Sequence, residues 1–300
     1  MKLSDHNYEL KFENTFLRTK GDAFQTFFER LMGLAYKADF MACRPWGKEG
    51  DRKNDGYLKS ERRLFQVYAP NEMDASKAKA KISADFEGAK QHWKRHFDSW
   101  VFVHNATDGL PPHVHELLLN FEAANPSIKI EPWCMEELRL IFRKLSDDDK
   151  AAWFGAALTE ETSIRLGFAD LQVVLETIEA LPAPQMTEVT DVPAGKIEAN
   201  ALSEAVTHMI RQGLVKSYLV ADFFTQWHDE TLGERLAEAF KAEYRRLRGV
   251  YAPNRIFAEL QSWAGGDHRG SPEHELAVLT VIAYYFERCD IFEEPRGAAK

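Results

Sequence analysis

The sequence lacks the features of several large protein classes. Its three cysteines, Cys43, Cys134 and Cys289, form no CxxC pair, which argues against a structural zinc site and is typical of a reducing cytoplasm. No apolar run approaches the ~20 residues that a membrane span needs. The charged N-terminus does not have the pattern of a secretory signal. We therefore expect a cytoplasmic protein that makes no contact with a membrane.

Several catalytic motifs are also absent. There is no GxxxxGK[ST] loop, so the chain is not itself a P-loop ATPase. There is no GxSxG element for hydrolase chemistry, and Gly265-Gly266 follows no predicted strand, so it is not a dinucleotide loop. His92 and His96 would share a helix face, but no third metal ligand accompanies them, and we expect solvated histidines.

Positive charge is in deficit, with a formal net charge of −9. An acidic chain is a poor general nucleic-acid binder, because binding to phosphates depends on clustered lysine and arginine. Residues 44–63 are the exception, with seven basic side chains against four acidic ones. This segment could contact a phosphate-bearing ligand or form a solvated hairpin surface, and the sequence leaves both readings open.

The first half of the chain alternates between helical and extended patterns. After a short polar lead-in over residues 1–20, apolar spacing predicts a helix over 21–36. The predicted strands are 40–46, 55–59, 64–69, 99–104 and 127–132, and the further helices are 74–97, 111–121 and 136–145. Helices interleaved with strands predict an α/β layer fold with a mixed sheet.

The second half shows no strong strand pattern. The predicted helices are 199–212, 214–226, 230–247, 254–264 and 273–288. Residues 181–195 carry three prolines, which indicates a linker. We therefore predict an α/β domain over residues 1–155, a bridging helix and linker over 156–195, and an all-helical domain over 196–300.

The stretch from Gly50 to Pro70 contains the candidate site. Asp55 opens the second predicted strand, and Gln66 is a polar residue within the apolar third strand. A buried amide costs free energy unless it is bonded, and we expect the two side chains to meet on neighbouring strands. Metal-dependent phosphodiester cleavage requires such oxygen ligands around Mg²⁺. The plainer alternatives are a tight Asn-Asp-Gly turn with positive φ values and an amide bonded within the sheet.

Glu29, Asp55 and Gln66, in this order of elements, resemble the restriction-endonuclease-like (PD-(D/E)XK) fold in its QxK variant with an additional helix acid. The resemblance covers roughly residues 20–135. It implies that Mg²⁺ is held by Asp55, Gln66 and Glu29. Position 68 departs from the motif, because Tyr68 stands where lysine is expected. A lysine at position 53 or 59 (Lys53 or Lys59) would then have to supply the cation.

The C-terminal run AYYFERCDIFEEP, residues 283–295, is similar to the ending of C-terminal-domain proteins in bacterial ABC-three-component systems. Residues 220–224 and the helix over 233–244 fit the same module. This resemblance implies an anti-phage defence function, with an ABC-type ATPase and a small middle component as partners. The apolar and acidic residues of the run fit either a buried terminal helix or a docking surface.

Together these observations predict a cytoplasmic bacterial defence component. Its nuclease-like domain would bind or cleave DNA with Mg²⁺, and its helical domain would dock on the ATPase-containing complex. The alternative is a catalytically inactive adaptor that uses the same fold to recognise a partner or a nucleotide. The sequence leaves the oligomeric state open, a homo-oligomer included.

Overall fold

The computed structural model describes residues 2–43, 53–179, 196–229, 231–265, 271–288 and 290–293. The chain divides into two compact units: an α/β unit of residues 15–149, and a helical unit of residues 1–14 together with 150–300. The predicted linker over 181–195 lies outside the described residues. Within the described ranges, no helix is both long enough and apolar enough to cross a membrane.

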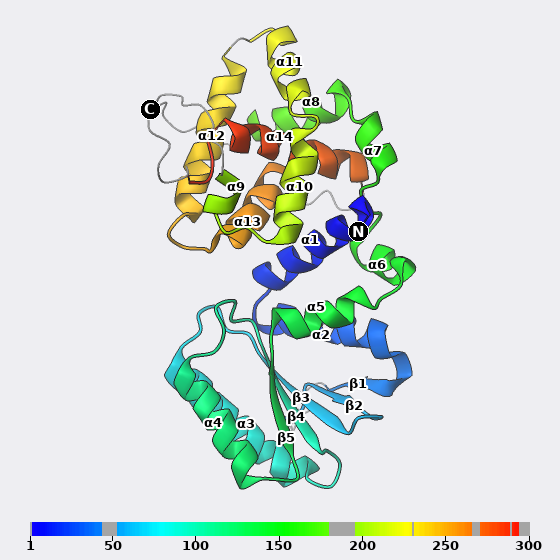
Figure 1. The fold of residues 1–300 in the computed structure, drawn as a ribbon, viewed down its shortest axis with the longest axis vertical. Helices are drawn as coiled ribbons and strands as arrows, with labels where there is room; N and C mark the ends of the chain where they lie inside the picture. Colours follow the sequence, from blue (N-terminus) through cyan, green and yellow to red (C-terminus); the bar gives the residue numbers. More distant parts are fainter. Residues whose placement is uncertain are drawn as a thin grey trace. The chain divides into compact units, whose positions relative to one another are not determined.

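The α/β unit contains one mixed sheet, as predicted (Figure 1). Its strands, in spatial order, are β1 (Phe40–Ala42), β2 (Gly56–Leu58), β3 (Arg63–Tyr68), β4 (Ser99–His104) and β5 (Lys129–Trp133). The first three strands form an antiparallel meander, and β3, β4 and β5 run parallel. β4 is buried along its whole length, as expected of a central parallel strand covered on both faces.

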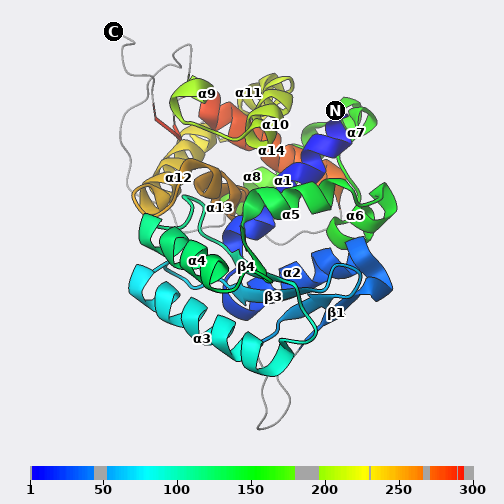
Figure 2. The same ribbon diagram turned by 60° about the horizontal axis from the view of Figure 1, so that its bottom comes forward.

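Helices cover both faces of this sheet. The helices of the unit are α2 (Gly21–Tyr36), α3 (Ala75–Trp93), α4 (Pro112–Ala124) and α5 (Met135–Arg143), with a 3₁₀ turn η1 (Lys37–Asp39). Figure 2 shows α3 and α4 side by side, and both pack on the face that carries Leu64 and Trp100. α2 packs on the other face, where the Phe28 and Phe65 ring centroids are 5.3 Å apart. Because strand side chains alternate, Gln66 shares the α3 face with Leu64.

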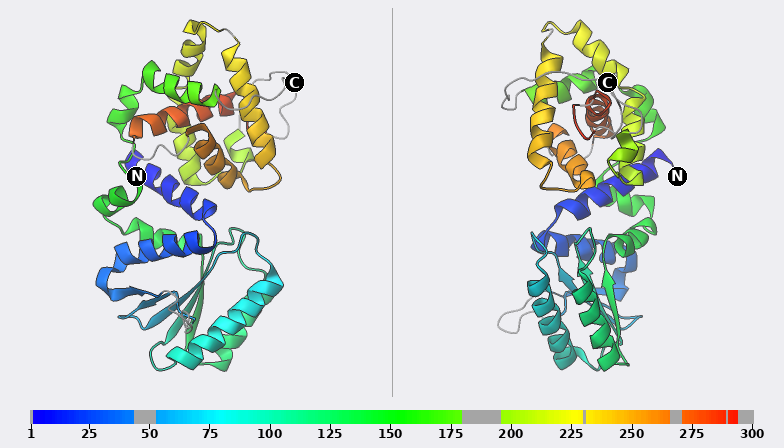
Figure 3. Two further views of the ribbon diagram at one scale, coloured as in Figure 1. Left: turned by 180° about the vertical axis from the view of Figure 1, so that it is seen from behind. Right: turned by 60° about the vertical axis from the view of Figure 1, so that its left-hand side comes forward.

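The helical unit is built around α14. Its helices after the boundary helix α6 (Asp147–Phe154) are α7 (Glu160–Arg165), α8 (Phe168–Glu179), α9 (Lys196–Ala199), α10 (Glu204–Leu214), α11 (Tyr218–Gln226), α12 (Leu232–Leu247), α13 (Pro253–Gly265) and α14 (Pro272–Glu287). α14 runs through the middle of the unit and packs against α7, α8, α10, α11 and α13 (Figure 3). Gly213 permits the approach of α10, because a Cβ there would lie 2.6 Å from the Leu279 carbonyl oxygen.

The N-terminal segment is a helix, α1 (Leu3–Arg18), so the expectation of a short lead-in was wrong. Leu3 and Leu10 enter the core of the helical unit. The buried Asn7 amide donates to Glu275 Oε1 at 2.8 Å, and its oxygen accepts the Leu158 N–H at 3.0 Å. α1 therefore docks partly through polar contacts, which an apolar-spacing argument does not detect.

Candidate functional site

Asp55 and Gln66 lie side by side, as expected from the sequence. Asp55 directly precedes β2, and its backbone N–H donates to the Phe65 carbonyl at 2.9 Å. The Gln66 Nε2 donates to Asp55 Oδ2 at 2.5 Å, and the Val67 N–H donates to the same oxygen at 2.7 Å. Both side chains are buried, with 4% and 2% of their surface exposed. Asp55 therefore bonds a side chain and a backbone group of β3 at the point where β2 begins.

One side-chain oxygen at this contact remains unsatisfied. Gln66 Oε1 is buried and has no hydrogen-bond partner in the part of the chain that the structure describes. Burying such an atom without a partner costs about 1–3 kcal/mol, and native structures rarely tolerate it without a water or an ion. The site therefore offers an amide oxygen and a carboxylate, which are ligand types that Mg²⁺ prefers.

The local backbone differs from the predicted Asn-Asp-Gly turn. The positive φ value falls on Lys53 (φ 62°), and neither Asn54 nor Gly56 has one. Gly56 is required for space instead, because a Cβ there would lie 2.6 Å from the Phe40 ring. The conformational reading of this glycine was therefore wrong, and its role is the close packing of β2 on the Phe40 ring.

Tyr68 lies on the same face of β3 as Gln66, two residues further along. Its ring centroid is 6.0 Å from that of Phe102. Burial raises the pKa of Tyr68, and the nearby Asp74 carboxylate raises it further. The side chain is therefore a neutral phenol at physiological pH, and it supplies no positive charge.

The two candidate lysines lie in different places. Lys53 Nζ is 3.1 Å from the Asp85 carboxylate of α3. Lys59 is exposed in the turn after β2, four residues beyond Asp55, which is about 13 Å along an extended strand. Lys53 is therefore the candidate that approaches the α3 face, whereas Lys59 lies at the opposite end of β2 from Asp55.

Glu29 lies on α2, and the Gln25 Nε2 of the same helix donates to its Oε1 at 2.9 Å. α2 packs on the Phe65 face of the sheet, whereas Gln66 lies on the α3 face. No group of three His, Cys, Asp or Glu side chains that could hold a metal ion occurs among the described residues. The structure thus brings Asp55 and Gln66 together, and the assignment of Glu29 as a third ligand stays a prediction.

Asp85 and Lys81 were not identified from the sequence. Asp85 is fully buried on α3, and its carboxylate pairs with Lys81 Nζ at 2.7 Å and with Lys53 Nζ at 3.1 Å. One signal was available: Asp85 interrupts the apolar stripe of α3 and follows Lys81 by four residues, the spacing of a helical ion pair. An acid within an apolar stripe predicts a buried, paired carboxylate.

His104, at the end of β4, was also overlooked. It is buried, and its Nδ1 accepts the Ala106 N–H at 3.2 Å, so the neutral ring carries its proton on Nε2. Burial is the main cause that lowers the pKa of His104, which is about 4 after the nearby Glu137 has opposed the shift and His115 has added to it. His104 is therefore uncharged at neutral pH and does not replace the missing lysine ammonium.

The C-terminal run packs inward. Tyr285, Phe292 and Asp290 are buried in the helical unit. Asp290 pairs with Lys241 Nζ at 3.1 Å, and Glu293 Oε1 accepts the Tyr244 hydroxyl at 2.9 Å. Of the two readings of this run, the structure bears out the buried terminal helix for Tyr285, Phe292 and Asp290, whereas the Glu293 side chain remains 46% exposed.

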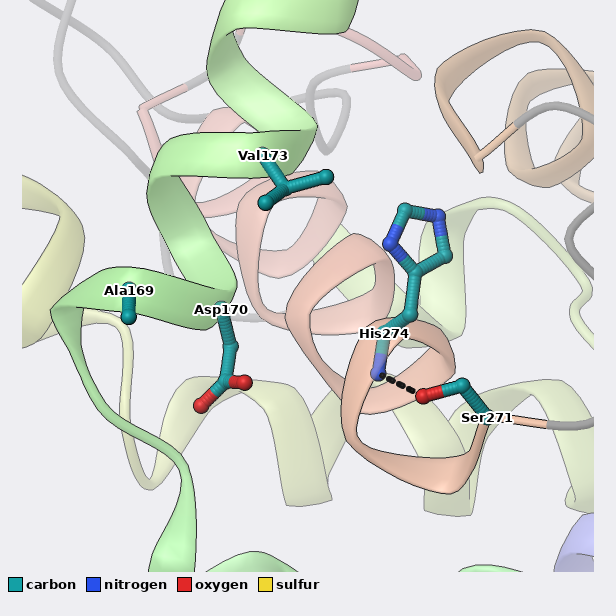
Figure 4. Close-up of a pocket in the computed structure, with 5 residues that line it drawn as sticks. All are labelled: Ala169, Asp170, Val173, Ser271 and His274. Carbon is teal, nitrogen blue, oxygen red and sulfur yellow. Dashed lines mark hydrogen bonds between the residues drawn. The ribbon is translucent and has the colours of Figure 1, made fainter.

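Figure 4 shows a cavity of about 330 Å³ between α8 and the start of α14, lined by Ala169, Asp170, Val173, Ser271 and His274. Its polar groups contribute to local structure. Ser271 Oγ caps α14 by accepting the His274 N–H, and Asp170 Oδ2 accepts the Gly167 N–H. Ser271 and Asp170 thus stabilise the beginnings of α14 and α8, and we assign no ligand to this cavity.

Residues 169–293 match the family model of C-terminal domain 10 of the ABC-three component (ABC-3C) systems. The chain carries this C-terminal domain. The match covers most of the helical unit, from α8 to the buried end segment, and it places this region in ABC-3C defence systems, whose members act with partners of the same system. No curated protein and no solved structure matches the chain.

Proposed function

We propose that this ABC-3C component binds nucleic acid through its α/β unit and cleaves it with Mg²⁺. In this proposal the helical C-terminal domain joins the chain to an ABC-type ATPase and to a middle component of the system. The match of residues 169–293 supports the second part. The first part rests on the contents of the Asp55–Gln66 site.

The observation that carries the cleavage proposal is the pairing of Asp55 with Gln66, whose own side-chain oxygen is unsatisfied among the described residues. Asp55 precedes β2, Gln66 lies in β3, and the two side chains are in direct contact. The order of helix, three-stranded meander, helix and parallel strand supports a restriction-endonuclease-like core. Gln66 Oε1, which is buried and unpartnered among the described residues, supports a cation ligand at this position.

The residues present fit Mg²⁺. Asp55 and Gln66 would hold it, and Glu29 is the additional acid that the sequence resemblance predicts. A bound Mg²⁺ supplies charge stabilisation at a scissile phosphate and a more acidic water. Lys53, held on Asp85, is the cation of this chain that would compensate the negative charge of the phosphate, because the neutral Tyr68 does not.

One observation favours the alternative function, an inactive adaptor. The Gln66 Nε2 and the Val67 N–H both donate to Asp55 Oδ2. This oxygen therefore stabilises the contact between the start of β2 and β3 without a metal ion. With Tyr68 in place of lysine, the α/β unit would then recognise a partner or a nucleotide without cutting it. A cleavage assay distinguishes the two functions.

The assay compares the full-length wild type with the Asp55→Asn and Glu61→Gln variants on DNA substrates, with Mg²⁺ or Mn²⁺. We expect cleavage by the wild type and a loss of at least about 100-fold in Asp55→Asn, because the variant lacks the carboxylate charge that holds the metal. Glu61→Gln removes an exposed acid of the same hairpin and serves as the matched control. Equal background cleavage by all three proteins would reject the enzyme and favour the adaptor.

A further inference from the structure

The two flanks of α3 have different polar side chains. Lys77, Lys81 and Asp85 follow one another at intervals of four residues, so they lie on one flank. Lys90 is nine residues from Lys81, which places it half a turn away on the other flank. Lys90 Nζ lies 3.4 Å from Asn125 Oδ1 at the end of α4. The flank that carries Lys81 therefore faces away from α4, toward the β2 side of the sheet.

Asp85 holds two lysines on this flank. Its fully buried carboxylate pairs through Oδ2 with Lys81 and through Oδ1 with Lys53. The two lysine side chains keep 36% and 40% of their surface exposed. Gly88 makes room for this arrangement, because a Cβ there would lie 2.5 Å from Lys53 Cγ. One buried negative charge thus pairs with two lysines whose side chains remain partly exposed to solvent.

This cluster and the Asp55–Gln66 pair lie on the same side of the sheet. Lys53 precedes Asp55 by two residues, and Gln66 lies on the face of the sheet that α3 covers. Lys77 extends the row by about 6 Å along the helix axis, and it is exposed; the Asp74 carboxylate accepts its backbone N–H. Lys53 and Lys81 together with Asp85 leave a net charge of +1 at this cluster.

We propose that Lys53, Lys77 and Lys81 form a binding site for the phosphodiester backbone of a nucleic acid, in which Asp85 is a positioning residue. Lysine ammonium groups at a protein surface bind phosphate oxygens and release counterions, with little dependence on nucleic-acid sequence. The buried carboxylate holds Lys53 and Lys81 in place before the ligand arrives, which lowers the entropy cost of binding. The proposal rests on the nucleic-acid binding proposed above and is independent of cleavage.

The test is fluorescence anisotropy of the full-length protein with labelled single-stranded DNA, duplex DNA and single-stranded RNA, in EDTA. Affinity is measured for the wild type, Lys81→Gln, Lys77→Gln and Lys90→Gln across a range of about 50 to 200 mM salt. We expect Lys81→Gln and Lys77→Gln each to reduce the slope of log affinity against log salt by about one. Each should also weaken binding several-fold at low salt.

Lys90→Gln is the matched control, because it removes the same charge from the opposite flank of the same helix. Lys77→Gln leaves both ion pairs of Asp85 in place, so its effect does not depend on the stability of that cluster. Absence of wild-type binding at low salt, or equal slopes for Lys81→Gln and Lys90→Gln, would overturn the proposal. The binding test in EDTA is independent of the cleavage assay in Mg²⁺. A protein that binds nucleic acid in the first experiment and does not cleave it in the second would reject the nuclease function and leave the binding site standing.

Discussion

The two units of this protein place the partners of their buried carboxylates differently. In the helical unit, Lys241 Nζ lies 3.1 Å from both Glu238 and Asp290, and the three side chains are only 12%, 5% and 1% exposed. In the α/β unit, the buried Asp85 pairs with Lys53 and Lys81, whose side chains keep 40% and 36% of their surface exposed. Buried oxygens without a hydrogen-bond partner among the described residues occur in both units. Of the two charged clusters, the one in the α/β unit presents charged side chains to solvent, which is what binding of a charged ligand requires.

The distribution of charge follows the same division. The helical unit carries 17 basic and 26 acidic side chains, whereas the α/β unit has 21 of each. The whole net charge of −9 therefore belongs to the helical unit. An acidic unit repels phosphates, so nucleic-acid binding is expected of the α/β unit alone.

The largest effect is expected in the helical unit, from Lys241→Met. This variant leaves Glu238 and Asp290 buried without their shared cation, and loss of one partner in a buried pair costs about 3–5 kcal/mol. The measurement is the free energy of unfolding in urea. Arg246→Met is the matched control on α12, because Arg246, the partner of Glu243, is itself 64% exposed, and ion pairs with an exposed partner contribute less than about 1 kcal/mol. Similar losses in the two variants would contradict a stabilising role of the buried Lys241 cluster.

A smaller effect concerns His104 in the α/β unit. Its pKa is about 4 in the folded protein, against about 6.5 in an unfolded chain. Below pH 6.5, His104 is therefore protonated in the unfolded chain but not in the folded protein. The free energy of unfolding falls as the pH drops from 6.5 toward 4. The expected loss at pH 5 relative to pH 7 is about 2 kcal/mol. Urea unfolding at both pH values measures it.

His104→Gln should flatten this part of the pH dependence, whereas His96→Gln should not, because His96 is exposed at the end of α3. A pH dependence that is identical in the wild type and His104→Gln would mean that another group is responsible. The result sharpens the comparison, because it assigns the acid sensitivity to one unit.

Much of the fold could be predicted from the sequence, because apolar periodicity determines which faces are buried. The strand at 99–104 and the helix at 21–36 have the predicted bounds. α1 was missed because buried polar residues such as Asn7, Glu9 and Glu13 lie between its buried apolar residues and obscure their helical spacing. The partners of Asn7, Glu275 and Leu158, are distant in the sequence, so the sequence pattern does not reveal these contacts.

The candidate site was predictable to a similar extent. The contact between Asp55 and Gln66 followed from a polar residue in an apolar strand, which requires a partner. The Lys53–Asp85 pair could not be anticipated, because its members come from a loop and a helix that only the fold brings together. The sequence could not decide between a buried end and a docking surface for the C-terminal run, since aromatic residues flanked by acids are common both at interfaces and in cores.

The most direct test of the central claim is a thermal melt with and without Mg²⁺. The account predicts that Mg²⁺ at about ten times its Kd stabilises the wild type by about 1.4 kcal/mol, a shift of a few degrees in Tm. Asp55→Asn and Gln66→Leu should lose the shift, and Glu61→Gln should keep it. A wild type that does not respond to Mg²⁺, or an equal shift in Asp55→Asn, would contradict the claim that the α/β unit holds its oxygens ready for a ligand.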